Sequence, residues 1–245
     1  PVGPGTFTRW SGFYVGGQIG YTNANAEFQN ATQPGLGYAL RETTLENEFN
    51  VSHWPTLGTA NQSAPTYGGF VGYNIQWQDA VVGVEANLNR AGFTLQAPST
   101  PIGPLITAPD SLGYTHSVTI SSTGSLTSTD FASLRARAGY VFGNFMPYGF
   151  AGLALGGMPN VSVASNLVDK QCNSATPPAC ALLTFSNSFS QNSQMLYGFA
   201  GGGGVDWALT PNVFLRAEFE WDVFNAPPGI LLTLVTGRVG GGFKF

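Results

Sequence analysis

Charged side chains are scarce in this chain of 245 residues. Lys and Arg together number 9 and Asp and Glu number 13, so 9% of the residues are charged and the formal net charge is -4. Soluble domains carry about 25% charged residues, and a solvated surface needs roughly that share or more. The small negative net charge also argues against a protein that binds nucleic acid through a basic surface. The composition therefore argues against a charge-rich soluble globule.

Long hydrophobic runs are missing as well. A helix that spans a membrane needs about 18 or more consecutive apolar residues, and the most apolar stretch, residues 195–209, is interrupted by four consecutive glycines and by Asp206. Each of those glycines would destabilise a helix by roughly 1 kcal/mol relative to alanine. Pro1 opens a short segment that has neither a basic region nor an apolar run. We therefore expect a mature chain from which any export signal has been removed.

Glycine and aromatic residues are abundant instead, with 33 Gly, 18 Phe, 9 Tyr and 5 Trp. A disordered chain would be poor in aromatics. A closed β-barrel satisfies every backbone group inside a membrane without helices, and alternating strands rich in Gly and aromatics are its signature. Eight segments alternate with period 2. They are residues 10–23, 66–77, 80–94, 129–142, 146–157, 194–209, 212–223 and 233–245.

The links between these segments are alternately long and short. The short ones are 78–79, 143–145 and 210–212, and the long ones are about 24–65, 95–128, 158–193 and 224–232. Outer-membrane barrels combine short periplasmic turns with long extracellular loops in this way. We predict an all-β fold with one domain over residues 1–245: a transmembrane, antiparallel, up-and-down β-barrel of eight strands, or ten if a loop hides a hairpin. Residues 1–9 would be an N-terminal periplasmic segment.

Seven charged residues lie on strand faces opposite the large aromatic side chains. An arginine in the middle of the lipid-facing surface costs about 2–4 kcal/mol, so we expect these side chains to point inward. Eight strands leave an interior just wide enough for side chains to fill, which predicts an ionic network that neutralises itself in the lumen. A narrow ion path along these charges and a pair of catalytic carboxylates are the alternatives. The seven residues are Glu85, Arg135, Arg137, Arg216, Glu218, Glu220 and Arg238.

The histidines and cysteines suggest little chemistry. His53 and His116 fall in predicted loops with no Cys, Asp or Glu at metal-ligand spacing beside them. A Ser/His/acid site would need a histidine on a strand beside a nucleophile, so we predict no catalytic residue, metal or cofactor. Cys172 and Cys180 flank a turn that contains residues 177–178, both proline. In an oxidising envelope they favour a disulfide.

The long loops are rich in Asn, Gln, Ser, Thr, Pro and Gly, yet they also hold Trp54, Leu105, Ile106 and Leu112. A flexible, solvated loop has no need of such large apolar side chains. They would either pack the loops on one another over the barrel mouth, or contact a partner or a neighbouring copy of the chain. Both interpretations stay open.

Four motifs resemble a known family. The opening strand WSGFYVGG (10–17), VGVEA (82–86), LRARAGY (134–140) and the closing strand 239–245 are similar to strands of the outer-membrane immunogenic proteins, porin-like surface antigens of alphaproteobacteria. The resemblance covers the predicted strands but not the long loops. It implies an eight-stranded barrel that crosses the outer membrane of a Gram-negative bacterium many times and exposes antigenic loops. Some relatives are described as haem binders, but the isolated histidines give haem no support.

The resemblance also implies a structural role in the cell envelope. The barrel would sit among outer-membrane lipid and lipopolysaccharide, present its loops to the exterior, and have the option of assembling laterally with copies of itself. The alternative is a small-solute or ion pore, and a lipid-modifying enzyme is a third possibility. Phe243 and Phe245 end the lipid-facing row of the last strand. By resemblance to outer-membrane barrels they form a signal for the barrel-insertion machinery, unless Phe245 is only one more aromatic at the membrane interface.

Overall fold

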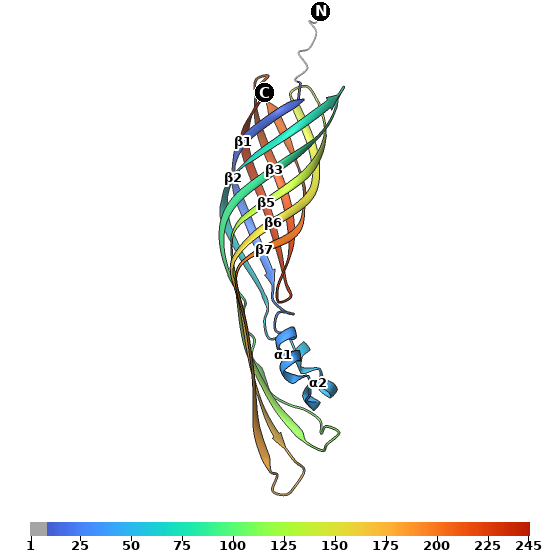
Figure 1. Ribbon diagram of the computed structural model, residues 1–245, viewed down its shortest axis with the longest axis vertical. Coiled ribbons are helices and arrows are strands. Elements are labelled where there is room, and N and C mark those ends of the chain that lie inside the picture. The colour runs from blue at the N-terminus through green and yellow to red at the C-terminus, as the bar shows by residue number, and fades with distance from the viewer. Residues whose placement is uncertain (1–8) are drawn as a thin grey trace, which may run out of the picture.

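Eight long antiparallel strands close into a barrel (Figure 1). The computed structural model describes residues 9–245, without the side chains of residues 159 and 194, so the expected periplasmic segment 1–9 lies outside it except for Arg9. Neighbouring strands pair in chain order, and pairing of β9 with β1 closes the barrel. The predicted eight-stranded barrel is confirmed. Its strands are β1 (Gly12–Glu27), β2 (Thr59–Trp77), β3 (Ala80–Gln96), β5 (Thr115–Tyr140), β6 (Phe145–Cys172), β7 (Cys180–Ala208), β8 (Val213–Ala226) and β9 (Ile230–Lys244).

The barrel wall turns apolar side chains outward at every second position. On β1, Phe13 and Ile19 are 63% and 65% exposed, whereas Tyr14 is buried. So large an exposed apolar surface is suited to lipid rather than water. The apolar band ends where outward positions become polar, as at Asn23 on β1 and its partner Ser63 on β2. Further exposed members of the band include Val15, Tyr21, Tyr67, Val71, Trp77, Val84, Leu134, Leu153, Phe199, Leu215, Trp221 and Val239.

Beyond the apolar band, the predicted loop bounds are wrong, because three strands continue there. Residues 158–193 belong to β6 and β7 except for the turn 173–179, and the hairpin of these strands reaches farthest from the barrel (Figure 1). Residues 95–128 contain half of β5 and the short strand β4 (Ile102–Ile106), which pairs with β5. That pairing is a hairpin hidden in a loop, but it lies outside the barrel wall and leaves the wall at eight strands.

The remaining loops are also shorter than expected. Residues 227–229 alone form the turn between β8 and β9. Three short helices occupy most of the link between β1 and β2: α1 (Gln33–Leu40), α2 (Thr44–Phe49) and the 3-10 turn η1 (Val51–His53). None of the described helices is long and apolar enough to cross a membrane.

The helices pack against one face of the extended strands. Leu36, Leu40 and Leu45 are buried against Val118 and Ile120 of β5. The side chain of Thr43 caps α2 by accepting the backbone N–H of Glu46, and Asn50, with φ at +48°, ends it. This helical layer and the extended sheet form one apolar cluster beyond the end of the barrel, which fulfils in part the expectation that the loops pack on one another. Trp54 joins this cluster, whereas Leu105, Ile106 and Leu112 are exposed.

Candidate functional site

The lumen of the barrel is filled in layers. Near the short turns lies an aromatic layer, and towards the helices an apolar one. Charged side chains separate these layers, as the order along β8 shows. Its inward residues are Phe214, Arg216, Glu218, Glu220, Asp222 and Phe224. The aromatic layer consists of Trp10, Tyr14, Phe70, Val81, Val141, Met146, Tyr148, Phe150, Ala208 and Phe214.

Glu85 is the centre of the half of the charged layer that lies nearer the short turns. Its Oε2 atom lies 2.8 Å from Nη1 of Arg216 and 3.0 Å from Nη1 of Arg137, and it accepts the hydroxyl of Tyr14 at 2.6 Å. Asp206 joins the same two arginines from the other side, at 2.8 Å from Nε of Arg216 and 2.6 Å from Nη2 of Arg137. Charge-assisted bonds of this kind hold strands β3, β5, β7 and β8 together across the lumen.

The half of the charged layer that lies nearer the helices is built around Arg135 and Arg238. Nη2 of Arg135 lies 2.7 Å from Oε2 of Glu218, and Nε of Arg135 donates to Glu85 at 3.1 Å. Nε of Arg238 donates to Oε1 of Glu218 at 2.8 Å, and its Nη2 pairs with Glu220. The structure thus places all seven charged residues singled out from the sequence in one buried network.

Two carboxylates of the layer were not among those seven. Asp206 completes a balance of four arginines against four carboxylates, and its inward parity beside Gly202 and Gly204 was visible in the alternation of β7. Asp222 is also buried, and neither of its carboxylate oxygens has a hydrogen-bond partner within residues 9–245. Asp222 lies on the inward face of β8, on the side of the four ion pairs that is nearer the helices, and that position could not be read from a single strand.

Aromatic rings of the layer near the short turns cover the guanidinium groups. Arg135 lies 3.8 Å from the ring centre of Phe150, and Arg137 lies 3.8 Å from that of Tyr148. Glycine makes room for these rings: a Cβ on Gly204 would lie 2.8 Å from the Tyr148 hydroxyl oxygen. Close approach of the rings thus explains Gly202 and Gly204, the two inward members of the four consecutive glycines of β7. The layer is a packed ionic core.

The histidine positions are a correction to the sequence interpretation. His116 is not in a loop but on β5, outside the apolar band, and it is buried between two carboxylates. Its Nδ1 lies 2.7 Å from Oδ2 of Asp169 and its Nε2 lies 3.2 Å from Oδ2 of Asp110. Asp169 is 53 residues away in the sequence and reaches His116 across the β5–β6 pairing. Asp110 is six residues away and reaches His116 only because the β4–β5 loop folds back.

The carboxylates set the charge of this cluster. Burial opposes a charged imidazole, but the hydrogen bonds and charges of Asp169 and Asp110 outweigh it and raise the pKa of His116. Burial also opposes ionisation of Asp110, yet the backbone N–H of Tyr114, the Thr44 side chain and His116 together lower its pKa to about 2. His116 therefore joins β5, β6 and the β4–β5 loop through contacts with two carboxylates that favour its protonated form.

His53 lies in a different arrangement. Ser52 donates its hydroxyl to Oε1 of Glu46 at 2.6 Å, and its Oγ lies 3.1 Å from Nδ1 of His53. In a catalytic triad the histidine stands between the acid and the nucleophile, whereas here the serine stands between them. Within residues 9–245, no three His, Cys, Asp or Glu side chains are placed to hold a metal ion.

Cys172 and Cys180 form the expected disulfide at the tip of the β6–β7 hairpin. They are directly paired residues of the two strands, with Cα atoms 4.1 Å apart. The bond fixes the end of the longest projection, so its effect is local to the tip.

The outward face of this extended sheet is polar and uncharged over most of its length. Every second residue of β5 from Ser117 to Thr127 is Ser or Thr. A shallow groove of about 530 Å³ crosses this face, between positions such as Ser121, Asn166 and Ser188. Within residues 9–245, neither the helices nor the barrel covers this face.

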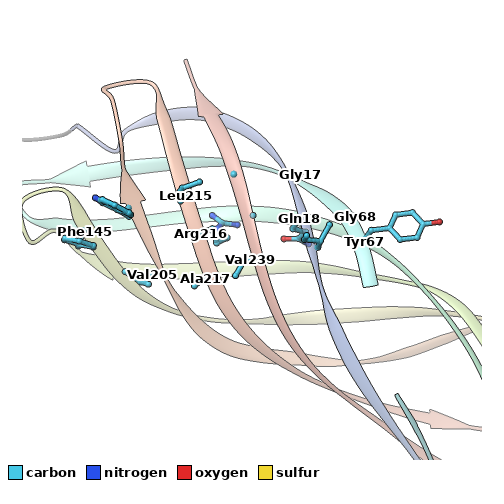
Figure 2. A pocket seen from close by; sticks show the side chains of 14 residues that line it. Gly17, Gln18, Tyr67, Gly68, Phe145, Val205, Leu215, Arg216, Ala217 and Val239 are labelled. Carbon is cyan, nitrogen blue, oxygen red and sulfur yellow. The ribbon is translucent and has the colours of Figure 1, made fainter. Parts of the chain in front are cut away.

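A large hollow lies on the outside of the barrel wall, over β1, β7, β8 and β9 (Figure 2). It measures about 1030 Å³ and is lined by outward residues such as Ile19, Leu215 and Val239, with glycines between them. Arg216 contributes only from behind, because its side chain is buried in the lumen. Its position within the apolar band makes this hollow a lipid-facing depression rather than a pocket for a soluble ligand.

Phe243 and Phe245 are 45% and 71% exposed on the outer face, with ring centres 5.2 Å apart. Phe245 donates its backbone N–H to Phe13 at 2.9 Å, which ties the C-terminus to β1. The pair lies at the short-turn end of the barrel, where the chain ends (Figure 1).

Comparison with known proteins gives a consistent result. The family profile of the outer membrane protein beta-barrel domain matches residues 6–221. The 25 kDa outer-membrane immunogenic protein of Brucella ovis is 25% identical over 197 residues, which are 80% of this chain and 72% of that protein.

Solved structures with lower identity are also similar. Neisserial surface protein A is 16% identical with a TM-score of 0.40, over 96% of this chain and 98% of that one. The outer membrane protein OprG of Pseudomonas aeruginosa is 13% identical with a TM-score of 0.40, over 96% of both chains.

Proposed function

This chain belongs to the outer membrane protein beta-barrel domain family and resides in the bacterial outer membrane, and from that premise we propose that it is a structural barrel whose function lies in the surface it presents outside the cell. The observation that carries the proposal is the division of the molecule. One end is closed by short turns, and the other projects a disulfide-tipped hairpin and a helical layer (Figure 1). The projecting end is the one that faces the exterior in barrels of this kind.

The filled lumen supports this role over that of a pore. Arg135 and Arg216 are 1% and 3% exposed, and their guanidinium groups lie between carboxylates and aromatic rings. An ion would have to displace these ion pairs and also pass the apolar layer on the side of the helices, which includes Phe131 and Phe224. Small-solute or ion conduction, the second candidate, would require this packing to rearrange.

A catalytic role has weaker support. The Glu46, Ser52 and His53 side chains are not in the order that activates a nucleophile, and His116 has both ring nitrogens engaged by carboxylates.

The lipid-facing depression favours lateral contact as part of the proposed role. Glycines such as Gly17 and Gly241 line it, so the wall of a neighbouring barrel could approach closely there, as small residues allow between membrane segments. Chemical cross-linking in native membranes tests this part. A dimer lost on Gly241→Phe but kept on Val84→Phe, a substitution on the far wall, would support it.

Surface labelling of intact cells tests the central proposal. A membrane-impermeant maleimide should label Ser188→Cys on the extended hairpin without permeabilisation. Pro211→Cys, in the short turn between β7 and β8, should be labelled only after the membrane is opened. The reverse pattern would show that the hairpin faces the periplasm and would reject the proposal.

A further inference from the structure

One edge of the extended sheet carries no partner strand from residues 9–245. The last pairing between β7 and β8 is Gly198 with Phe224, yet β7 continues back to Cys180, paired there only with β6. At about 3.3 Å per residue, this stretch is on the order of 60 Å long. On its free side every second residue turns its backbone N–H and C=O outward, and within residues 9–245 no hydrogen bond reaches these groups between 181 and 197.

The opposite edge of the same sheet is protected. β4 is only 5 residues long, contains Pro104, and has a register shift between Ile102 and Leu105. Short length, proline and irregular register are the means by which proteins prevent unwanted edge pairing. The β7 edge has none of them: residues 181–193 include no Pro, Gly or charged residue. Low charge and the absence of Pro and Gly are features that favour strand addition.

A site for an added strand is already shaped beside this edge. A hollow of about 270 Å³ lies between α1 and β7, lined by Pro34, Tyr38, Asn187 and Phe189 among others. Tyr38 is 67% exposed and stands on α1 next to the edge. A strand added to β7 would therefore gain a side-chain contact as well as backbone hydrogen bonds.

We propose that the edge of β7 over residues 181–193 pairs antiparallel with the same edge of a second copy of this chain, anchored in a facing membrane. The inference rests on the proposed function only in that the hairpin must face outward. An identical, uncharged edge on each partner suits an isologous two-fold contact.

The sequence of the edge is self-complementary in the antiparallel direction. If the two-fold axis passes Asn187, Phe185 of one copy lies opposite Phe189 of the other, and the pair occurs twice. Both phenylalanines are on the helix-facing side of the sheet, where each is partly buried against apolar residues. Directly opposed aromatic side chains are among the favourable cross-strand pairs.

The membrane anchors determine which copies can pair in this way. Two copies in one membrane hold their β7 strands in the same direction, so their edges could meet only in parallel. Antiparallel pairing needs strands that run in opposite directions, which copies in two facing membranes provide. The edge would then join adjacent cells or vesicles.

Cysteine pairs test both the contact and its direction. Leu183→Cys and Gln191→Cys are placed in two separate populations of phospholipid vesicles, since these positions lie opposite each other about Asn187. Mild oxidation of the mixed vesicles should give a disulfide-linked dimer several-fold above that of either population alone. No excess in the mixture would overturn the proposal, and so would equal dimer within each single population, because that result means parallel pairing in one membrane.

Charge on the edge provides the matched control. Vesicles that carry the unmodified chain should cluster, as measured by light scattering, and the double variant Ser186→Lys, Ser188→Lys should abolish clustering. The variant Ser121→Lys, Thr123→Lys puts the same charge on the same sheet face two strands away, and it should cluster normally. Equal clustering of both variants would reject edge pairing. If pairing fails while cell-surface labelling succeeds, this inference falls and the proposed function stands.

Discussion

Arg216 and Glu85 are 131 residues apart in the sequence, yet Nη1 of the arginine lies 2.8 Å from Oε2 of the glutamate in the centre of the lumen. The contact crosses the barrel from β8 to β3, two strands that are not neighbours in the wall. It therefore ties opposite sides of the barrel together, which hydrogen bonds between adjacent strands cannot do.

Removal of Arg216 should be strongly destabilising. Arg216→Ala leaves Glu85 and Asp206 partly unpaired in a buried site, and the loss of one partner of a buried ion pair costs roughly 3–5 kcal/mol. Urea unfolding in lipid vesicles, followed by tryptophan fluorescence, measures this loss. Arg90→Ala is the control, because Arg90 and Asp130 form an ion pair with both side chains largely exposed, worth less than about 1 kcal/mol. Equal effects would show that the lumen network is not a source of stability.

The sequence predicted the barrel wall well because lipid imposes a strict rule on it. From Leu215 to Val223 on β8, outward positions are apolar and inward positions are charged, and Glu218 and Glu220 were assigned inward for that reason. On β6 both faces are apolar within the barrel. The inward positions, such as Tyr148 and Phe150, could not be told from the outward Leu153 by pattern alone.

The extension beyond the membrane could not be predicted in the same way. Water accepts Ser, Thr and Asn on the outer face of β5 and β6, so the strands there lack the aromatic row that marks them in the wall. The inward Val118 and Ile120 keep the period, but their signal depends on α1 and α2 covering them. Those helices are held by tertiary packing, and the cluster around His116 joins residues 53 positions apart.

Loss of the disulfide should loosen the hairpin tip without unfolding the barrel. Cys180→Ser removes the link between Cys172 and Cys180, which in so short a loop contributes up to about 2–3 kcal/mol. Hydrogen exchange should accelerate around the turn 173–179, with no change in β8 and β9. Alkylation of the unreduced wild-type chain should find no free thiol, and labelling of both cysteines would contradict the assignment.

The stability of the β4–β5 loop and of its contacts with the helical layer should depend on pH through His116. Because the pKa of His116 is raised in the folded state, its stabilising effect is complete below the unfolded value of about 6.5 and is lost as the pH rises through the folded value. Hydrogen exchange of residues 107–116, corrected for intrinsic rates, should show more protection at pH 6 than at higher pH.

His116→Gln tests the origin of that pH dependence. The variant should lower protection at pH 6 and remove its dependence on pH in this range. If the same pH dependence persists in His116→Gln, another group is responsible.

Deletion of Phe245 should separate stability from insertion. If the residue only covers lipid-facing surface, its loss costs about 1.5–3 kcal/mol of burial and the barrel still reaches the membrane. We expect instead that the shortened chain fails to insert in cells but folds when purified into detergent. Protease shaving of the surface hairpin measures insertion. Phe13→Ala, an exposed aromatic at the same end, is the control and should insert normally, and normal surface levels of the shortened chain would refute the signal.

Planar-bilayer conductance of the folded chain tests most directly the claim that the lumen is sealed and that function lies on the external hairpin. The packed layer of Arg135, Glu218 and the surrounding rings predicts no steady current at neutral pH. Reproducible channels of fixed conductance in the wild-type chain, altered by Arg135→Ala, would contradict the account and make the protein a pore.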